Sequence, residues 1–192
     1  VAARYEFADA SLRFLRIMPL LERAAGVGFL QDHQMIVSLD RGVVSAPQGG
    51  LVNAAGTSFV ILDTRIKGGD GQVSLALDGS ITALMSLLDV EPLRLISKAG
   101  QSVTLADGRG SVSGSLQFPL RKGVPPNQIK FDVAAILRDV RSETLIKDRD
   151  LRASRLALAA DNAGLQISGP VTLDGIAANG SWNQRFGAAG RG

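Results

Sequence analysis

The sequence predicts a mainly β fold with two short helical segments, in which a curved antiparallel sheet forms an open groove or taco-like half-barrel. Three observations lead to this prediction. The stretch from Gly108 to Leu120 alternates strictly between apolar and polar residues, as a strand with one apolar face does. The same alternation returns along most of the chain. Turns between short strands are provided by 22 glycines and 7 prolines.

The composition bounds the kinds of site that the chain can hold. It has 192 residues, of which 45% are hydrophobic and 5% aromatic, so a sizeable apolar core can form. The chain contains no cysteine, which excludes disulfides, thiolate metal sites and cysteine nucleophiles. The net charge of +3 comes from basic residues scattered among acidic ones, and we therefore expect no nucleic-acid partner.

The chain begins with Val1 and not with Met, and we interpret it as a piece of a longer protein. We expect a single domain over residues 1–192 with an ordered part at about 5–186, followed by disorder in the small residues 187–192. No apolar run reaches the ~18 residues that a membrane-spanning helix requires.

The N-terminal segment predicts a helix over residues 11–25. Asp9 or Ser11 would cap its start and Gly26 would end it, while Pro19 would kink it. Apolar residues spaced three or four apart form a stripe along this helix: Leu12, Leu15, Met18, Leu21 and Ala25. The stripe fits a helix that packs on one end of the sheet, or a surface that covers a groove or meets a membrane.

A second helical segment is expected in the middle of the chain. Ile81–Leu88 forms a short helix with Ser80 as its N-cap. Pro92–Lys98 forms another short piece that ends at Gly100.

Strands are expected wherever apolar residues alternate between turn signals. They span residues 5–7, 35–39, 51–52, 57–62, 72–78, 101–106, 108–120, 129–137, 152–161, 165–168, 171–173 and 176–182. Turns are predicted at Asp40–Gly42 and Asp161–Gly164. Residues 121–127 form an exposed loop, and residues 140–150 are charged and less regular.

Few residues offer catalytic chemistry. His33 is the single histidine, and a hydrolase would have to combine it with Asp32 or Asp40 and with Ser38 as nucleophile. The polar segment around it shows no sign of the rigid geometry that a triad needs, so we expect a solvated turn histidine. Trp182, near the end of the chain, is expected to plug the last core layer.

Two short motifs resemble cation sites. Gly68-Gly69-Asp70-Gly71 is similar to one unit of a calcium-binding glycine repeat, but it occurs once and such sites need stacked repeats. Asp148 and Asp150 place two carboxylates on one strand face, which suits a divalent cation or a surface charge cluster. We expect a hairpin turn at the first motif and a charge cluster at the second, with no cofactor and no enzymatic activity.

The order of several motifs resembles the AsmA-like superfamily of Gram-negative envelope proteins, and within it the periplasmic domain of YhdP-type proteins. The resemblance covers about residues 7–186. It rests on a Pro-Leu segment, a strand with a Gly turn, a second helix, a glycine-rich strand and closing hairpins: Phe14–Leu21 before Gly26, Leu39–Val44, Ala83–Leu88 with Glu91–Leu93, Gly110–Leu116 with Phe118–Leu120, and Leu165–Pro170 with Leu173–Gly175, Ser181–Asn183 and Phe186.

The resemblance implies a long β-sheet groove that runs across the periplasm from an inner-membrane anchor and carries phospholipid acyl chains towards the outer membrane. It carries over no catalytic residue. The expected partners are phospholipid acyl chains, the rest of the parent chain and other envelope proteins. The best lipid-facing candidates are the apolar residues of three strands: Val73, Leu75, Leu77, Val112, Leu116, Phe118, Ile129, Phe131 and Val133.

Each candidate residue is equally compatible with an ordinary closed core. An alternative function is a structural or scaffolding β module that binds envelope proteins through its sheet edges without lipid cargo. A closed second layer over the nine residues would favour that alternative.

Overall fold

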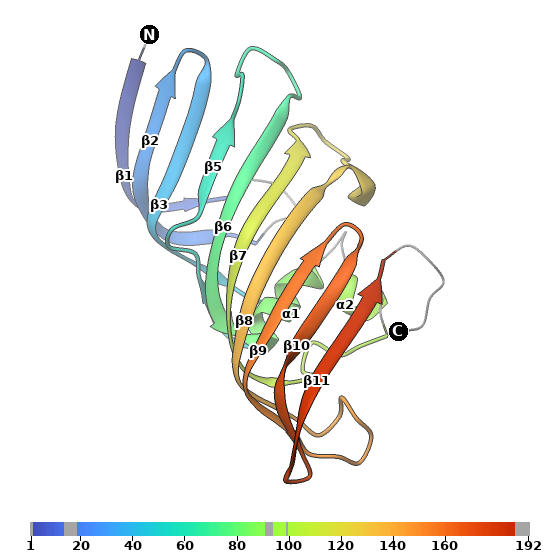
Figure 1. The fold of residues 1–192 in the computed structure, drawn as a ribbon. Coiled ribbons are helices and arrows are strands. Elements are labelled where there is room, and N and C mark those ends of the chain that lie inside the picture. Colours follow the sequence, from blue (N-terminus) through green and yellow to red (C-terminus); the bar gives the residue numbers. More distant parts are fainter. Residues whose placement is uncertain (1, 14–18, 91–93, 99, 187–192) are drawn as a thin grey trace.

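The computed structural model describes residues 2–13, 19–90, 94–98 and 100–186. These residues form one curved antiparallel sheet, two short α-helices and a 3-10 turn (Figure 1). The strands are β1 (Ala2–Leu12), β2 (Leu21–Gln31), β3 (Gln34–Ser45), β4 (Leu51–Asn53), β5 (Ser58–Ile61), β6 (Asp70–Ser80), β7 (Asp107–Pro119), β8 (Lys130–Ser142), β9 (Leu151–Asp161), β10 (Gly164–Leu173) and β11 (Ile176–Arg185). The helices are α1 (Ile81–Leu88), α2 (Leu95–Lys98) and the 3-10 turn η1 (Pro126–Gln128).

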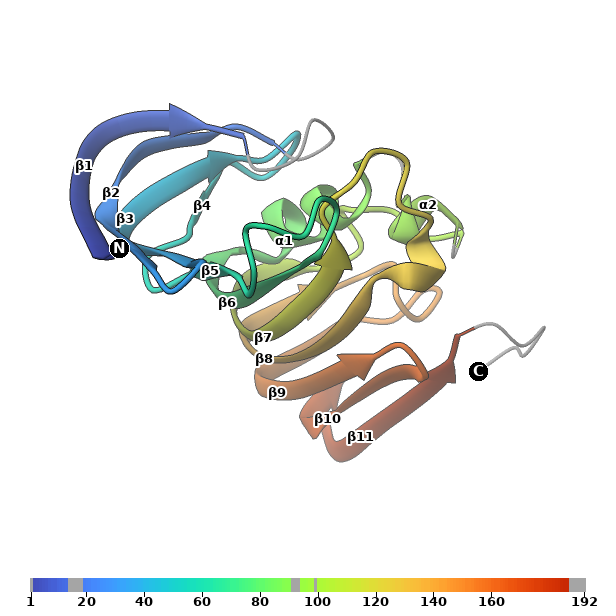
Figure 2. The same ribbon diagram turned by 90° about the horizontal axis from the view of Figure 1, so that it is seen from above.

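The sheet is a meander in which each strand pairs with its neighbour in the sequence, except that β4 and β5 do not pair with each other. The order is β1-β2-β3-β4-β6-β7-β8-β9-β10-β11, and β5 pairs with β3 and β6 beyond the end of β4. The short strands β4 and β5 therefore share one position in the sheet. Strands β1 and β11 lie at opposite edges, so the sheet is open (Figure 2). The predicted fold class is confirmed.

The alternation of residues 108–120 assigns the two faces of the sheet. In β7, Gly110 pairs with Gly79 of β6 and with Leu137 of β8. A side chain on Gly110 would meet Leu84 of α1, whose Cδ1 lies 2.6 Å from the position of a Cβ. Helix α1 therefore lies on the apolar face, and Figure 2 shows the sheet bending around this helix. We call this apolar side the concave face and the opposite side the convex face.

Bulges in several strands bend the sheet. Asp9 in β1 and Arg23 in β2 adopt positive φ angles of 49° and 51°, beside shifts in the pairing of these strands. Farther along the sheet, Asp139 (φ 53°) and Val140 of β8 lie opposite the single residue Gly108 of β7. A bulge bends its strand and increases the local twist, so these irregularities produce the curvature.

Two buried clusters lie inside the bends, at the end of the sheet where β6 enters α1. The first joins the N-terminal strands, with Leu21, Ala24, Leu39 and Ala54 buried and Phe7, Ala10, Leu12, Val44 and Leu77 packed around them. The second joins α1 to the C-terminal strands, with Ile81, Val140, Ala153 and Leu156 buried and Met85, Ala106, Leu137, Ile167 and Val171 around them.

Helix α1 is held by its cap and by the loop before β4. The predicted N-cap Ser80 accepts a hydrogen bond from the backbone N–H of Ala83 at 3.0 Å, and the predicted bounds Ile81–Leu88 are confirmed. Ser80 also donates to the carbonyl of Gly49, at 2.8 Å. Ser86, only 3% exposed, donates to the carbonyl of Gln48 at 3.0 Å. The loop and the helix thus form one unit.

The predicted helix over residues 11–25 is wrong. Strand β1 runs through Leu12 and β2 begins at Leu21, while residues 14–18 lie outside the described part. In β2 the positive φ of Arg23 lets Leu21 and Ala24 face the same side, and a bulged strand imitates the helical spacing of three residues.

Other predicted boundaries also change. The predicted turn at 40–42 lies within β3, and residues 101–106 form turns before β7. Strand β8 continues to Ser142, and the two short strands predicted over 165–173 are one strand, β10. Pro170 is tolerated there because it lies at a shift in the pairing with β9.

Some expectations concern residues that are not described. Residues 92 and 93, at the start of the helical piece predicted at 92–98, lie outside the described part, as do the residues 187–192 for which disorder is expected. Among the described residues, no helix has the length and apolar character that crossing a membrane requires.

Candidate functional site

The nine candidate residues belong to one continuous surface on the concave face. Val73 of β6, Leu116 of β7 and Phe131 of β8 are cross-strand partners. The neighbouring rows follow the same register and contain Leu75, Gly114 and Val133, then Leu77, Val112 and Ala135. Phe118 pairs with Gly71, and Ile129 immediately precedes β8. Residues two apart in a strand share a face, so the register brings all nine candidates to the same side.

These side chains are neither enclosed nor fully exposed. Phe118 is buried, with 4% of its surface exposed, and the other eight are half-buried. In the described part of the chain, the strand pairs in extensive contact are all neighbours within the sheet, and α1 packs on β4, β6 and β7. No second sheet among the described residues therefore covers the candidates. Leu77 packs against the buried cluster of the N-terminal strands. The burial of the other candidates comes from curvature and from lateral packing.

Phe118 is buried beside a glycine whose missing side chain leaves room for larger neighbours. Its partner Gly71 has no side chain, and a Cβ there would lie 2.8 Å from Leu120 Cδ2 and 2.9 Å from Phe59 Cε2. The Leu120 and Phe59 side chains fill that space. The end of the concave face remote from α1 is therefore closed locally by aromatic and leucine side chains.

The apolar rows extend beyond the three predicted strands. One row continues from Val73 through Phe59, Val37 and Gly28 to Tyr5 at the β1 edge, where the Tyr5 ring lies over Gly28. The sequence prediction did not assign these residues to the surface, although the alternation in residues 35–39 and 57–62 contained the signal.

Another row continues from Ala135 through Leu158 and Ile167 to Trp182 at the β11 edge. Trp182 is 39% exposed and Phe186 is 44% exposed, so Trp182 does not plug a core layer as predicted. Its strand is the last of the described sheet, and no described strand covers its outer side. The apolar surface thus reaches both edges of the sheet.

The convex face carries the polar partners of the same strands. Asp78 accepts a 2.7 Å hydrogen bond from Ser111 Oγ and a 2.5 Å contact from Arg109 Nη2. The Ser111 hydroxyl, followed by the Arg109 guanidinium, lowers the pKa of Asp78. Arg138 Nη1 donates to Ser111 Oγ at 3.2 Å. This network connects β6, β7 and β8 and supports their register.

The residues considered for a hydrolase are dispersed. Asp32 and His33 form the exposed two-residue turn between β2 and β3, with φ angles of 48° and 70°. The His33 carbonyl accepts a hydrogen bond from the Thr64 N–H at 2.8 Å. Ser38 lies five residues along β3, about 16 Å away at the rise of an extended strand. No His–Ser hydrogen bond is possible at that separation.

The two motifs that resemble cation sites have other partners. Asp150 Oδ2 accepts from Arg152 Nε at 2.8 Å, and Arg149 Nη1 contacts Asp174 Oδ2 at 2.5 Å. Asp70, in the glycine motif, accepts from Gln117 Nε2 at 3.1 Å. Among the described residues, no group of three or more His, Asp or Glu side chains is arranged to hold a metal ion.

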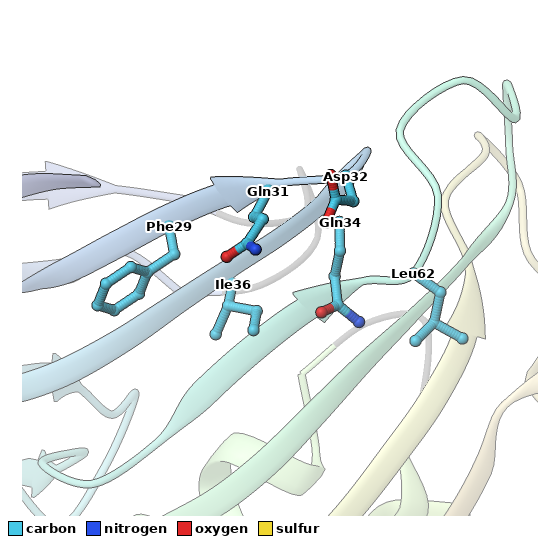
Figure 3. A pocket seen from close by; sticks show the side chains of 6 residues that line it. All are labelled: Phe29, Gln31, Asp32, Gln34, Ile36 and Leu62. Atoms are coloured by element: carbon cyan, nitrogen blue, oxygen red, sulfur yellow. The ribbon is translucent and has the colours of Figure 1, made fainter. Parts of the chain in front are cut away.

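A shallow depression lies on the convex face near the β2–β3 turn (Figure 3). It has a volume of about 560 Å³ and mixes apolar and amide side chains: Phe29, Gln31, Asp32, Gln34, Ile36 and Leu62. Arg4 lies 5.9 Å from the centre of the Phe29 ring. Asp32 is the one carboxylate among the residues that line the depression, and His33 follows it in the same exposed turn.

Comparison of the chain with protein-family models, curated proteins and solved structures finds no match.

Proposed function

We propose that this chain is a periplasmic segment of an AsmA-like, inner-membrane-anchored protein, and that its concave face holds phospholipid acyl chains during transport between the inner and outer membranes. The observation that carries the proposal is the continuous apolar surface on one side of an open curved sheet. Most of this surface is half-buried. Helix α1 packs over its end near Gly110, and among the described residues no second sheet lies over the rest.

The chemistry of the surface suits an acyl chain. Removing a methylene group from water is worth about 0.8 kcal/mol, so several methylenes in contact with leucine, valine and phenylalanine give useful affinity without any polar contact. The side chains of the three central rows are aliphatic or aromatic, with glycine and alanine between them. A lining without fixed hydrogen bonds lets a chain slide, which transport requires.

Native mass spectrometry of the purified chain, followed by lipid extraction, tests the proposal. We expect co-purifying phospholipid in the wild type and its loss in the double variant Leu75→Asp and Phe131→Asp. The matched control is Ser74→Asp with Ala134→Asp, which puts the same charges on exposed convex-face neighbours of these residues. Circular dichroism checks that all three proteins are folded. A lipid-free wild type that takes up no fluorescent phospholipid contradicts the proposal.

A scaffolding module is the second candidate function, because the two edge strands are long. Among the described strands, β1 and β11 each pair on one side only, and they have 11 and 10 residues. Unpaired strand edges offer N–H and C=O groups to an added strand. In this case the wild type would be lipid-free, and a partner peptide would bind along β1 or β11. Binding would be abolished by proline substitutions in that edge strand.

A further inference from the structure

Two loops lie side by side at the end of the sheet remote from α1. One is the β5–β6 connection and the other is the β7–β8 connection (Figure 2). The Leu120 N–H donates to the Gly69 carbonyl at 2.8 Å. A Cβ on Gly68 would lie 3.6 Å from the Cβ of Arg121. We define residues 62–70 and 120–130 together as the basic rim.

The basic rim accounts for the whole net charge of the chain. It contains five basic residues and two acidic ones, which leaves 16 basic and 16 acidic residues elsewhere out of totals of 21 and 18. The basic residues are Arg65, Lys67, Arg121, Lys122 and Lys130, and the acidic ones are Asp63 and Asp70. The surface outside the rim is therefore neutral overall, although its charges are numerous.

Most of the rim cations are available to an external anion. Asp63 is bound in bidentate fashion by Arg65, at 2.9 and 2.7 Å, and the Arg65 hydrogen bonds lower the pKa of Asp63 to about 2. Lys67, Arg121 and Lys122 are exposed. None of these three forms an ion pair with a carboxylate of the described residues. Arg121 Nη2 donates a hydrogen bond to the neutral amide oxygen Oε1 of Gln128 at 2.5 Å, so the positive charge of Arg121 is not neutralised.

Apolar side chains stand between these cations. Ile66 is 60% exposed and Leu62 is 49% exposed. The Ile66 side chain lies over Gly69, where a Cβ would be 3.2 Å from Ile66 Cγ2. Leu120, at the base of the second loop, lies with Phe59 over Gly71 on the concave face. The exposed tip at Ile66 is therefore joined to the base of the second loop through Gly69, whose carbonyl accepts the hydrogen bond from the Leu120 N–H.

We propose that the basic rim docks on an anionic phospholipid surface, with Lys67, Arg121 and Lys122 at the headgroup phosphates and Ile66 inserted among the headgroups. Clustered basic residues are attracted to anionic lipids, and an exposed isoleucine beside them adds apolar insertion. The proposal rests on the proposed function in one respect: docking at the rim brings a lipid next to the end of the concave face that is remote from α1, beside Leu120 and Phe59.

The opposite end of the sheet offers a natural comparison. The loop over residues 143–150 also exposes an isoleucine, Ile146, at 40%. Its charged residues are Lys147 and Arg149 against Glu143, Asp148 and Asp150. This loop is acidic overall, so an anionic surface would be repelled there. The two loops therefore share an exposed isoleucine and differ in the sign of their net charge, so comparing them tests whether the basic residues are needed for docking.

Vesicle flotation at low salt tests docking. We expect the 192-residue chain to float with vesicles of roughly three parts phosphatidylethanolamine to one part phosphatidylglycerol, and not with phosphatidylcholine vesicles. The variant K67Q/R121Q/K122Q should bind about 100-fold more weakly, at about a factor of five per cation. Ile66→Ser should cost about tenfold. The matched controls R141Q/K147Q/R155Q and Ile146→Ser should float like the wild type.

Each contrary result overturns docking. These results are equal flotation with uncharged vesicles, equal loss in the control variants, or displacement by millimolar inorganic phosphate at constant ionic strength, which would indicate a site for free anions. Uptake of a fluorescent short-chain phospholipid from solution is measured in parallel. Uptake without flotation overturns docking and leaves lipid binding by the concave face standing. Flotation without uptake supports docking and contradicts lipid binding by the concave face.

Discussion

Replacing Phe118 and Phe131 separately by alanine compares an enclosed position with an open one on the same concave face. Phe118 is 4% exposed and pairs with Gly71, over which the Leu120 and Phe59 side chains lie. Its truncation leaves a cavity, for which core phenylalanines lose about 3–5 kcal/mol. Phe131 is half-buried and has no described layer above it. Truncation there opens no enclosed cavity, and we expect a loss of about 1–2 kcal/mol in unfolding free energy.

Urea unfolding with and without phospholipid measures both the loss of unfolding free energy in each variant and the stabilisation that lipid binding adds. A ligand that binds only the folded protein adds about 2.7 kcal/mol at one hundred times its dissociation constant. The wild type should gain stability on adding lipid, and Phe131→Ala should gain less because it loses part of the lipid contact. If both variants lose about 4 kcal/mol and lipid stabilises neither them nor the wild type, Phe131 belongs to a closed core and the reasoning fails.

Three further substitutions test the structural basis of the fold. Ser86→Ala should lower the unfolding free energy by about 1–3 kcal/mol, because the Gln48 backbone groups lose a buried partner; an unchanged urea midpoint would contradict this. Gly114→Ala should cost at least ~2 kcal/mol, since its Cβ would lie 2.2 Å from the Asp132 carbonyl oxygen; calorimetry checks it, and an unchanged Tm refutes it. Asp78 has a lowered pKa, so its contribution is present above the unfolded pKa and lost as pH falls through the folded one. Asp78→Asn should therefore flatten the acid limb of stability below about pH 4, and urea midpoints from pH 3 to 6 that fall as steeply as in the wild type would contradict this.

The strands of the C-terminal half could be predicted because each pattern is local. Alternation in residues 108–120 and 152–161 matches β7 and β9 closely, and the Ser80 cap with its apolar run locates α1 at its observed bounds. Periodicity and capping depend on residues within one element. The shared face of the nine candidates follows from the same alternation, once the register is known.

The N-terminal half could not be predicted in this way because a bulge changes the period. Arg23 shifts the phase of β2, so Leu21 and Ala24 face the same cluster although they are three residues apart. A bulge depends on pairing with β1 and β3, which no single segment encodes. The basic rim was missed for a related reason: its two loops are fifty or more residues apart in sequence and become neighbours only through the pairing of β6 with β7.

Quenching of a single tryptophan by phospholipid with brominated acyl chains tests lipid binding by the concave face most directly. Trp182 is the only tryptophan, and changing it to phenylalanine leaves room for one reporter. Phe131→Trp places that reporter on the concave face, and Ile136→Trp places it on the convex face of the same strand. Bromine quenches only at contact range, so we predict saturable quenching at position 131, relieved by unbrominated lipid, and none at position 136. Equal quenching at both positions, or quenching at position 136 alone, would contradict binding of acyl chains by the concave face.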